Sequence, residues 1–223
     1  MSRSEGDDDF DDRSSEQLDF DDELTRTLIT LMKGRSLTKL IDFFSKDADY
    51  LVSRVNLMQV YEKETGFSLL HLAVFKKFSG DIEKVLLNQI KENCKDPEKI
   101  KKYLSAQTRN DDGHTALHLA SFHGNFSAIK FLIQEGADPQ VASKNSLSYL
   151  HIAAQGDQPY AFYIRDKFNL KSIDVENDLT LINCRDKNGC TPLHWAVYMG
   201  SPISISYLLA NKDVDIDARD IWG

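Results

Sequence analysis

The sequence predicts an all-α protein in which short helix-turn-helix units stack into a solenoid. Three observations predict this fold class. A seven-residue motif centred on a histidine recurs four times, its second and third histidines are 33 residues apart, and apolar residues at helical spacing follow it. A unit of two short helices cannot bury its apolar face alone, so neighbouring units must stack.

The motif has a hydroxyl residue three places before the histidine, a leucine just before it and an alanine two places after it. Its copies are SLLHLAV from Ser68, TALHLAS from Thr115, SYLHIAA from Ser148 and TPLHWAV from Thr191. Ser or Thr here is a helix N-cap, whose side-chain oxygen accepts an otherwise unpaired backbone N–H. A helix is therefore expected after each hydroxyl residue, and Pro192 suits the first helical position because it lacks an N–H.

Glycine and apolar positions downstream predict where the first helix ends and a second one follows. Gly124 and Gly200 each fall six residues after their histidine, where a left-handed residue can end a helix. Ile129 and Leu132, like Ile205 and Leu208 in the fourth copy, then have the spacing of an apolar helix face.

Two intervals between histidines are longer than the repeat of 33 residues. The interval is 47 residues between the first and second motifs and 43 between the third and fourth, so each carries an insertion. We expect the first insertion to be helical, because Leu86, Ile90 and Cys94 continue an i, i+4 stripe and Asp96-Pro97 is typical of a helix start. The second insertion, near residues 170–180, is polar and predicts a loop.

Two copies depart from the pattern. Lys77 stands where the first copy should have its helix-ending glycine. In the third copy Gly156 comes one residue early and Arg165 occupies an apolar position. We therefore expect a distorted second helix over residues 159–167.

The negative charge is concentrated at the N-terminus. Residues 1–23 hold eleven acidic and two basic residues, which leaves the rest of the chain close to neutral against a net charge of −8. Such a run predicts a solvated, disordered tail, although its aromatic residues also fit a short interaction segment. Residues 24–61 have leucines at helical spacing and are interpreted as an N-terminal helical cap or degenerate repeat. No broad basic field remains for nucleic acid.

The repeated positions resemble the ankyrin-repeat family over about residues 63–223. The repeats are expected at 63–104, 109–141, 142–184 and 186–218, and the acid-x-x-Gly turn within residues 219–223 begins a further one, so we expect more repeats after it. The resemblance implies a solenoid with projecting turns or β-hairpins, called fingers below. It also implies that a protein or peptide partner binds the concave surface formed by the fingers and the first helices.

A narrower resemblance concerns about residues 149–210, which look like the N-terminal ankyrin array of DHHC-type palmitoyltransferases, particularly protozoan ones. In that family the array lies on the cytosolic side of the membrane and recruits clients for an enzyme domain later in the chain. The resemblance makes Gln155 and Trp195 candidate client contacts. Nothing of the enzyme domain itself is present in these residues.

The family's geometry implies two sets of candidate partner contacts. The finger positions are Arg109, Asp112, His114, Lys144, Asn145, Lys187 and Asn188. The concave helix positions are Phe122, His123, Gln155, Trp195, Tyr198 and Met199. Exposed aromatic residues and Met are common anchors for a protein partner. The alternative for Phe122 and Trp195 is that they only pack between repeats.

No motif indicates a catalytic residue, a cofactor or a metal site. The phosphate-binding, dinucleotide-binding, nucleophile-elbow and HExxH motifs are absent from the sequence. One histidine per repeat at one position indicates a structural role. His114 and His118 have a spacing that can hold zinc, but Thr115 places His114 outside the helix and no cysteine is near. Three cysteines without a CxxC pair fit reduced thiols.

The sequence therefore predicts a protein-binding module that is not itself an enzyme, and the narrower resemblance implies a longer parent that is a protein S-acyltransferase. No secretory signal and no apolar run near the ~20 residues of a membrane helix occur, so we expect a cytoplasmic location without membrane insertion. Two alternatives remain. One is a structural or scaffold component of a larger cytoskeletal assembly, and the other is an enzyme fragment, for which the sequence supplies no nucleophile–base pair.

Overall fold

The computed structural model of the chain describes residues 13–34, 36–46, 56–75, 82–170 and 181–223. These residues fall into two compact units, one up to Asn56 and one from Leu57 onward.

The first unit consists of helices α1 (Arg13–Gly34) and α2 (Leu37–Lys46), which pack against each other. Leu28 and Met32 on α1 are buried, as are Leu40 and Phe44 on α2, each pair at i, i+4 spacing. Helix α1 begins within the segment for which a disordered tail was predicted. The sequence from residue 13 to residue 33 contains no Gly or Pro, and acidic residues near a helix N-terminus interact favourably with its dipole. Residues 1–12 lie outside the described residues.

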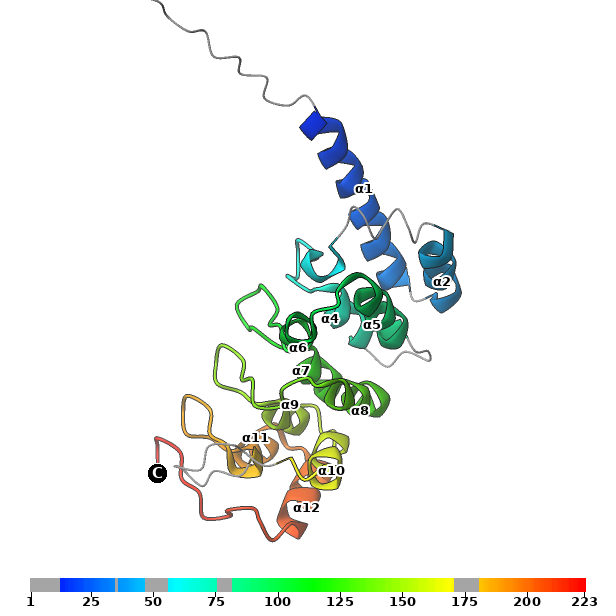
Figure 1. The fold of residues 1–223 in the computed structure, drawn as a ribbon. Helices are drawn as coiled ribbons and strands as arrows, with labels where there is room; N and C mark the ends of the chain where they lie inside the picture. The colour runs from blue at the N-terminus through cyan, green and yellow to red at the C-terminus, as the bar shows by residue number, and fades with distance from the viewer. Residues whose placement is uncertain (1–12, 35, 47–55, 76–81, 171–180) are drawn as a thin grey trace, which may run out of the picture. The chain divides into compact units, whose positions relative to one another are not determined.

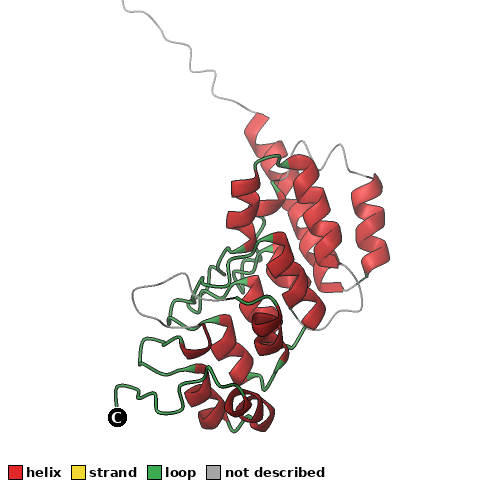
Figure 2. Ribbon diagram, turned by 60° about the horizontal axis from the view of Figure 1, so that its bottom comes forward, coloured by secondary structure: helices red, strands yellow, loops and turns green. Residues whose placement is uncertain are grey.

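The second unit is a stack of helix pairs (Figures 1 and 2). Its elements are η1 (Leu57–Gln59), α4 (Leu69–Val74), α5 (Ile82–Asn93), α6 (Pro97–Leu104), α7 (Ala116–Phe122), α8 (Phe126–Glu135), α9 (Tyr149–Gln155), α10 (Tyr160–Lys167), η2 (Leu181–Asn183), α11 (Pro192–Met199) and α12 (Pro202–Ala210). The first helices α4, α7, α9 and α11 contact one another in that order, and α8 packs against α10. The loops before α7, α9 and α11 project on one side, at the left of Figure 1.

This architecture confirms the predicted all-α solenoid. The described residues contain no β-strand, and the projecting fingers carry only isolated bridges, between Tyr61 and Ser68 and between Gln107 and Thr115. Among the described helices, none is both long enough and apolar enough to span a membrane.

All four motif hydroxyl residues are N-caps, as predicted, and each forms a reciprocal capping box with its histidine. The hydroxyl oxygen accepts the histidine backbone N–H, and the ring Nδ1 accepts the backbone N–H of the cap. In the second copy, Thr115 N lies 3.2 Å from His118 Nδ1. Pro192 occupies the start of α11, where no donor is needed.

The same rings join one repeat to the next. Because Nδ1 accepts an N–H, the neutral ring carries its hydrogen on Nε2. This Nε2 donates to the carbonyl oxygen that precedes the next cap: His71 to His114 at 3.0 Å, His118 to Leu147 at 2.8 Å and His151 to Cys190 at 2.9 Å. Burial lowers the pKa of His71 and His151 to about 4 and that of His118 to about 3. These three buried histidines are therefore neutral parts of the scaffold.

Successive fingers are also linked through their backbones. Lys144 N donates to Asp112 O at 3.0 Å, and the equivalent bond to Asn188 O comes from Ile221 N, also at 3.0 Å. A weaker bond of 3.5 Å joins Lys187 N to Asn145 O. This ladder orders the finger tips at a regular spacing.

The predicted helix ends are confirmed in two copies and corrected in the third. Gly124 and Gly200 have φ of +60° and +66°, so each supplies the left-handed residue after a first helix. In the third copy the left-handed residue is Asp157, with φ of +51°, whereas Gly156 has a φ of −83°. Gly156 is instead required by close approach, because a Cβ there would lie 2.3 Å from the carbonyl oxygen of Phe122.

The expected distortion over residues 159–167 is also wrong, because α10 is a regular α-helix. Arg165 fits the apolar position since its buried guanidinium pairs with Asp166 at 2.6 Å. The first insertion is helical, as predicted: it forms α5 and α6, and Asp96 caps α6. Lys77 and residues 171–180 lie outside the described residues, so those two expectations remain predictions.

Candidate protein-binding surface

The ends of α7, α9 and α11 present equivalent side chains in a row. Phe122, Gln155 and Tyr198 each stand seven residues after their N-cap. Phe122 is 43% exposed and Tyr198 is 81% exposed, whereas Gln155 is half-buried. We call this row, with its neighbours His123, Trp195 and Met199, the first-helix surface. The structure thus brings the predicted helix positions together on one side of the array.

Ring contacts hold several of these side chains in place. The Phe122 and His123 rings lie 5.2 Å apart, and His123 meets Phe75 of the preceding repeat at 4.9 Å, both edge to face. The rings of Trp195 and Tyr198 are also perpendicular, at 6.0 Å. Such contacts add to area burial and reduce the entropy lost when a partner binds.

Trp195 is tied to the finger that precedes its helix. Its indole Nε1 donates to Asp186 Oδ2 at 2.9 Å, and Asp186 is itself buried. The other carboxylate oxygen accepts the backbone N–H groups of Asn188 at 2.8 Å and Cys190 at 2.9 Å. One aspartate therefore shapes the finger and orients the tryptophan, which stays half-buried.

Several predicted finger residues contact a neighbouring finger. Lys187 Nζ donates to Asn145 Oδ1 at 2.7 Å, and Lys144 Nζ donates to the carbonyl oxygen of Asn110 at 2.5 Å. The Arg109 guanidinium lies 3.5 Å from the Tyr61 ring centroid. These cations cross-link the fingers, and their role in partner contact stays a prediction.

A cavity of about 750 Å³ lies between α11 and the last two fingers, and we call it the terminal cavity. Its lining residues are Asn188, Cys190, Leu193, His194, Trp195, Val197, Tyr198, Asp215, Ile216, Ala218, Asp220 and Trp222. Both tryptophans of the chain line it. Sequence reasoning missed Asp215, Ile216 and Trp222, because the last acid-x-x-Gly turn was interpreted only as the start of a repeat.

The charge in the terminal cavity is negative. Among the described residues, Asp215 and Asp220 line the cavity and no Lys or Arg does. Burial raises the pKa of the Cys190 thiol, and the negative charges of Asp186 and Asp220 raise it further. The thiol itself lies 3.9 Å from Asp220 Oδ2.

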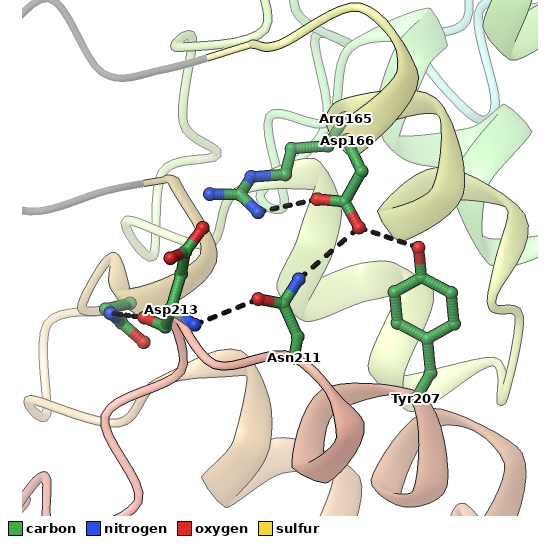
Figure 3. Close-up of polar contacts among 6 residues, drawn as sticks. Arg165, Asp166, Tyr207, Asn211 and Asp213 are labelled. Carbon is green, nitrogen blue, oxygen red and sulfur yellow. Dashed lines mark hydrogen bonds and ion pairs between the residues drawn. The ribbon is translucent and has the colours of Figure 1, made fainter.

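A polar network positions the loop that carries Asp215 (Figure 3). Asp166 on α10 accepts the Tyr207 hydroxyl at 2.7 Å and the Asn211 amide at 3.3 Å, so it joins two repeats. Asn211 in turn accepts the backbone N–H of Asp213 at 3.0 Å. Asn183 completes the network by accepting the backbone N–H of Asp215 at 2.9 Å.

One cysteine and histidine lie close together, but their environment opposes nucleophilic chemistry. Cys184 Sγ is 3.1 Å from Ser148 Oγ and 3.7 Å from His151 Nδ1. Burial raises the pKa of Cys184 to about 11 and lowers that of His151 to about 4. A catalytic pair needs the opposite shifts, with a thiolate beside a protonated ring. The two side chains belong to the capping network instead.

His114 and His118, whose spacing in the sequence could hold zinc, have structural roles as well. Both ring nitrogens of His118 are engaged, Nδ1 with Thr115 and Nε2 with the carbonyl oxygen of Leu147. His114 stacks on that ring with centroids 5.6 Å apart. Within the residues that the structure describes, no group of three His, Cys, Asp or Glu side chains is arranged to hold a metal ion.

Comparison with known families agrees with this geometry. Residues 91–176 match the description of ankyrin repeats in three copies, and residues 188–221 match a single ankyrin repeat. The chain therefore belongs to the ankyrin-repeat family. Ankyrin repeats are a non-catalytic protein–protein interaction module, so the chain itself is an interaction module and not an enzyme.

Curated relatives of different kinds match about half of the chain. The human transient receptor potential cation channel subfamily A member 1 is 29% identical over 113 residues, which are 50% of this chain and 10% of the channel. Palmitoyltransferase AKR1 of Lachancea kluyveri is 31% identical over 115 residues, which are 49% of this chain and 14% of that protein. The chain thus corresponds to a small part of either relative.

A solved structure is similar in fold. It is the crystal structure of the yeast ribosomal protein Rps3 in complex with its chaperone Yar1, and one of its chains matches with a TM-score of 0.56. The match covers 68% of this chain and 97% of that chain at 23% sequence identity. At this identity the likeness supports the repeat fold alone.

Proposed function

We propose that this chain is a recognition module that binds a client protein on its first-helix surface, the concave side of an ankyrin array. The observation that carries the proposal is the exposure of Phe122 and Tyr198 at equivalent places on α7 and α11. Large aromatic side chains held in fixed positions provide contact area at low entropic cost, and they are typical anchors of protein interfaces.

The finer proposal is that the client is recruited for a palmitoyltransferase of which this array is one part. The relative in Lachancea kluyveri supports it, as does the sequence resemblance of the last two complete repeats. In such a parent the array would hold a client while a separate domain acylates one of its cysteines. The repeats would select the client, and the separate domain would carry out the acylation.

The binding surface is tested by cross-linking in cells that produce the chain, with quantitative mass spectrometry of the attached proteins. The variant Phe122→Ala should lower the yield of specific client adducts at least about tenfold, as expected for loss of a hot-spot residue. The matched control is Tyr160→Ala, since Tyr160 on α10 is also 43% exposed. Equal loss in the control, or an unchanged adduct yield in Phe122→Ala with the fold intact, would contradict this surface.

The palmitoyltransferase proposal needs a separate measurement. Clients recovered with the unmodified chain should carry hydroxylamine-sensitive S-acyl groups, and this acylation should fall in cells that produce only Phe122→Ala. Clients without S-acylated cysteines would refute the finer proposal and leave the recognition module in place.

A further inference from the structure

The helices that form the first-helix surface contain no acidic or basic residue apart from histidine. Helices α7, α9 and α11 lack Asp, Glu, Lys and Arg, and so do the residues directly before and after each of them. By contrast, the second helices α8 and α10 expose charged side chains such as Lys130 and Lys167. The buried rings of His118 and His151 add no charge, because burial lowers their pKa to about 3 and about 4.

Phe122 and Gln155 reach this surface from the interior of the stack. Helix α7 packs against α4 and α9, and α9 packs against α7 and α11, so each has a described first helix on both sides. Phe122 is nevertheless 43% exposed, and Gln155 is half-buried. Their accessibility is therefore a property of repeats that are packed on both of their stacking faces.

The cations of the neighbouring fingers already have partners within the chain. The Nζ atoms of Lys144 and Lys187 each donate to a residue of the preceding finger. The Arg109 guanidinium lies over the Tyr61 ring, and Arg185 donates to two backbone carbonyl oxygens. An acidic client segment would have to break one of these contacts for each ion pair that it formed.

We propose that the first-helix surface binds an extended client segment whose side chains carry no charge over about six residues. This inference rests on the proposed function and names the chemistry of the client. A charged side chain placed on α7 or α9 would lose hydration without meeting an opposite charge, and this cost discriminates against it. The Phe122 ring would instead anchor an apolar side chain.

The length of the segment follows from the geometry of stacked helices. Packed helices lie about 8–10 Å apart, so the path from α7 across α9 to α11 is about 20 Å long. An extended chain advances about 3.3 Å per residue and covers this path in about six residues. Charged residues of the client are tolerated on either side of these positions.

A library of random nonapeptides displayed on phage tests the chemistry of the segment. The chain is immobilised at pH 8, where an ordinary imidazole is neutral, and phage are sequenced before and after selection. In the aligned central positions of the selected peptides, Asp, Glu, Lys and Arg should be at least about threefold rarer than in the unselected library. Enrichment on the Phe122→Ala chain should be at least about tenfold lower.

A charge placed on the surface should change the selected sequences. The variant Gln155→Lys should raise the frequency of Asp and Glu at one central position at least about threefold, because its ammonium attracts a carboxylate. The matched control is Gln134→Lys, since Gln134 is an exposed glutamine on the second helix α8. This control should select the same sequences as the unmodified chain. Circular dichroism verifies that both variants are folded.

Specific outcomes would overturn the inference. Selected peptides with charged residues at the library frequency would refute an uncharged segment, and so would a failure to enrich any peptide over the Phe122→Ala chain. Binding of neutral phosphatidylcholine vesicles that depends on Phe122 would identify a lipid as the occupant. Self-association that depends on Phe122, measured by sedimentation, would identify a second copy.

The cross-linking measurement judges the proposed function separately. Client adducts that are lost in Phe122→Ala would still support a recognition module, even if the selected peptides are rich in charge. Adducts that persist in this variant would count against the recognition surface itself, whatever sequences the library yields.

Discussion

The side chain that most clearly links sequence to structure in this protein is the hydroxyl residue before each motif histidine. In the second copy, Thr115 Oγ1 contacts His118 Nδ1 at 2.7 Å and accepts its backbone N–H at 3.4 Å, while both residues are buried. Loss of the hydroxyl therefore removes a helix cap and one partner of the ring that reaches the next repeat. A single oxygen contributes to the helix start and to stacking.

We predict that Thr115→Ala lowers the free energy of unfolding by about 1–2 kcal/mol, the upper half of the range for N-cap removal, because the cap is buried. Urea denaturation followed by circular dichroism measures this change. Thr115→Ser keeps the oxygen and should recover most of the stability. If the alanine and serine variants are equally stable, the hydroxyl has no capping role.

At the scale of the helix pair, two glycines serve different purposes that the sequence does not distinguish. Gly200 has a φ of +66° and no neighbour within 4 Å of an added Cβ. Gly156 has an ordinary φ but lies against the backbone of Phe122 in the preceding repeat. The first glycine is required by conformation and the second by the distance between repeats.

We predict that both Gly200→Ala and Gly156→Ala destabilise the array, for these separate reasons. Gly200→Ala should cost about 1–2 kcal/mol, the penalty of a left-handed L-residue. Gly156→Ala should cost about 1–3 kcal/mol through a forced backbone shift. Gly200→Asn separates the two causes, because asparagine tolerates the left-handed region and should recover part of the loss, whereas Gly156→Asn should be no better than Gly156→Ala. Thermal denaturation of the four variants measures the effect, and recovery by asparagine at both sites would contradict it.

At the scale of the whole array, His71, His118 and His151 form a buried series that stays neutral. Their folded pKa values, about 4 for His71 and His151 and about 3 for His118, lie below the ordinary value of 6.5. The unfolded chain therefore binds more protons than the folded one between about pH 6.5 and pH 4. The stabilisation is fully present above pH 6.5 and is lost as the pH falls through this window.

We predict a steep loss of stability with acid, of up to about 1.4 kcal/mol per pH unit for each buried ring. Urea midpoints measured from pH 7.5 to pH 5 test this slope. The variant His118→Gln should be less stable at pH 7.5 but should show a shallower dependence on pH, because one titrating ring is gone. An identical slope in the variant would assign the acid sensitivity to other groups.

The sequence alone determined the features that depend on neighbours a few residues apart. Local hydrogen bonding and periodicity predict the N-caps, the helix-ending residues Gly124 and Gly200, and the helical first insertion. The repetition of the motif indicated the family and placed the candidate partner contacts in a row on the first helices. Assignment of Phe122 and Tyr198 as partner contacts remains a prediction from that pattern.

Only the tertiary structure decided features made by segments that are well separated in the sequence. Asp166 meets Tyr207 across a distance in sequence of 41 residues, Gly156 meets the backbone of Phe122, and the terminal cavity combines α11 with the last finger. These contacts depend on the spacing and rotation between stacked repeats, which local propensity does not encode. For the same reason the rings and carboxylates of the terminal cavity became visible as one group only when the repeats were stacked.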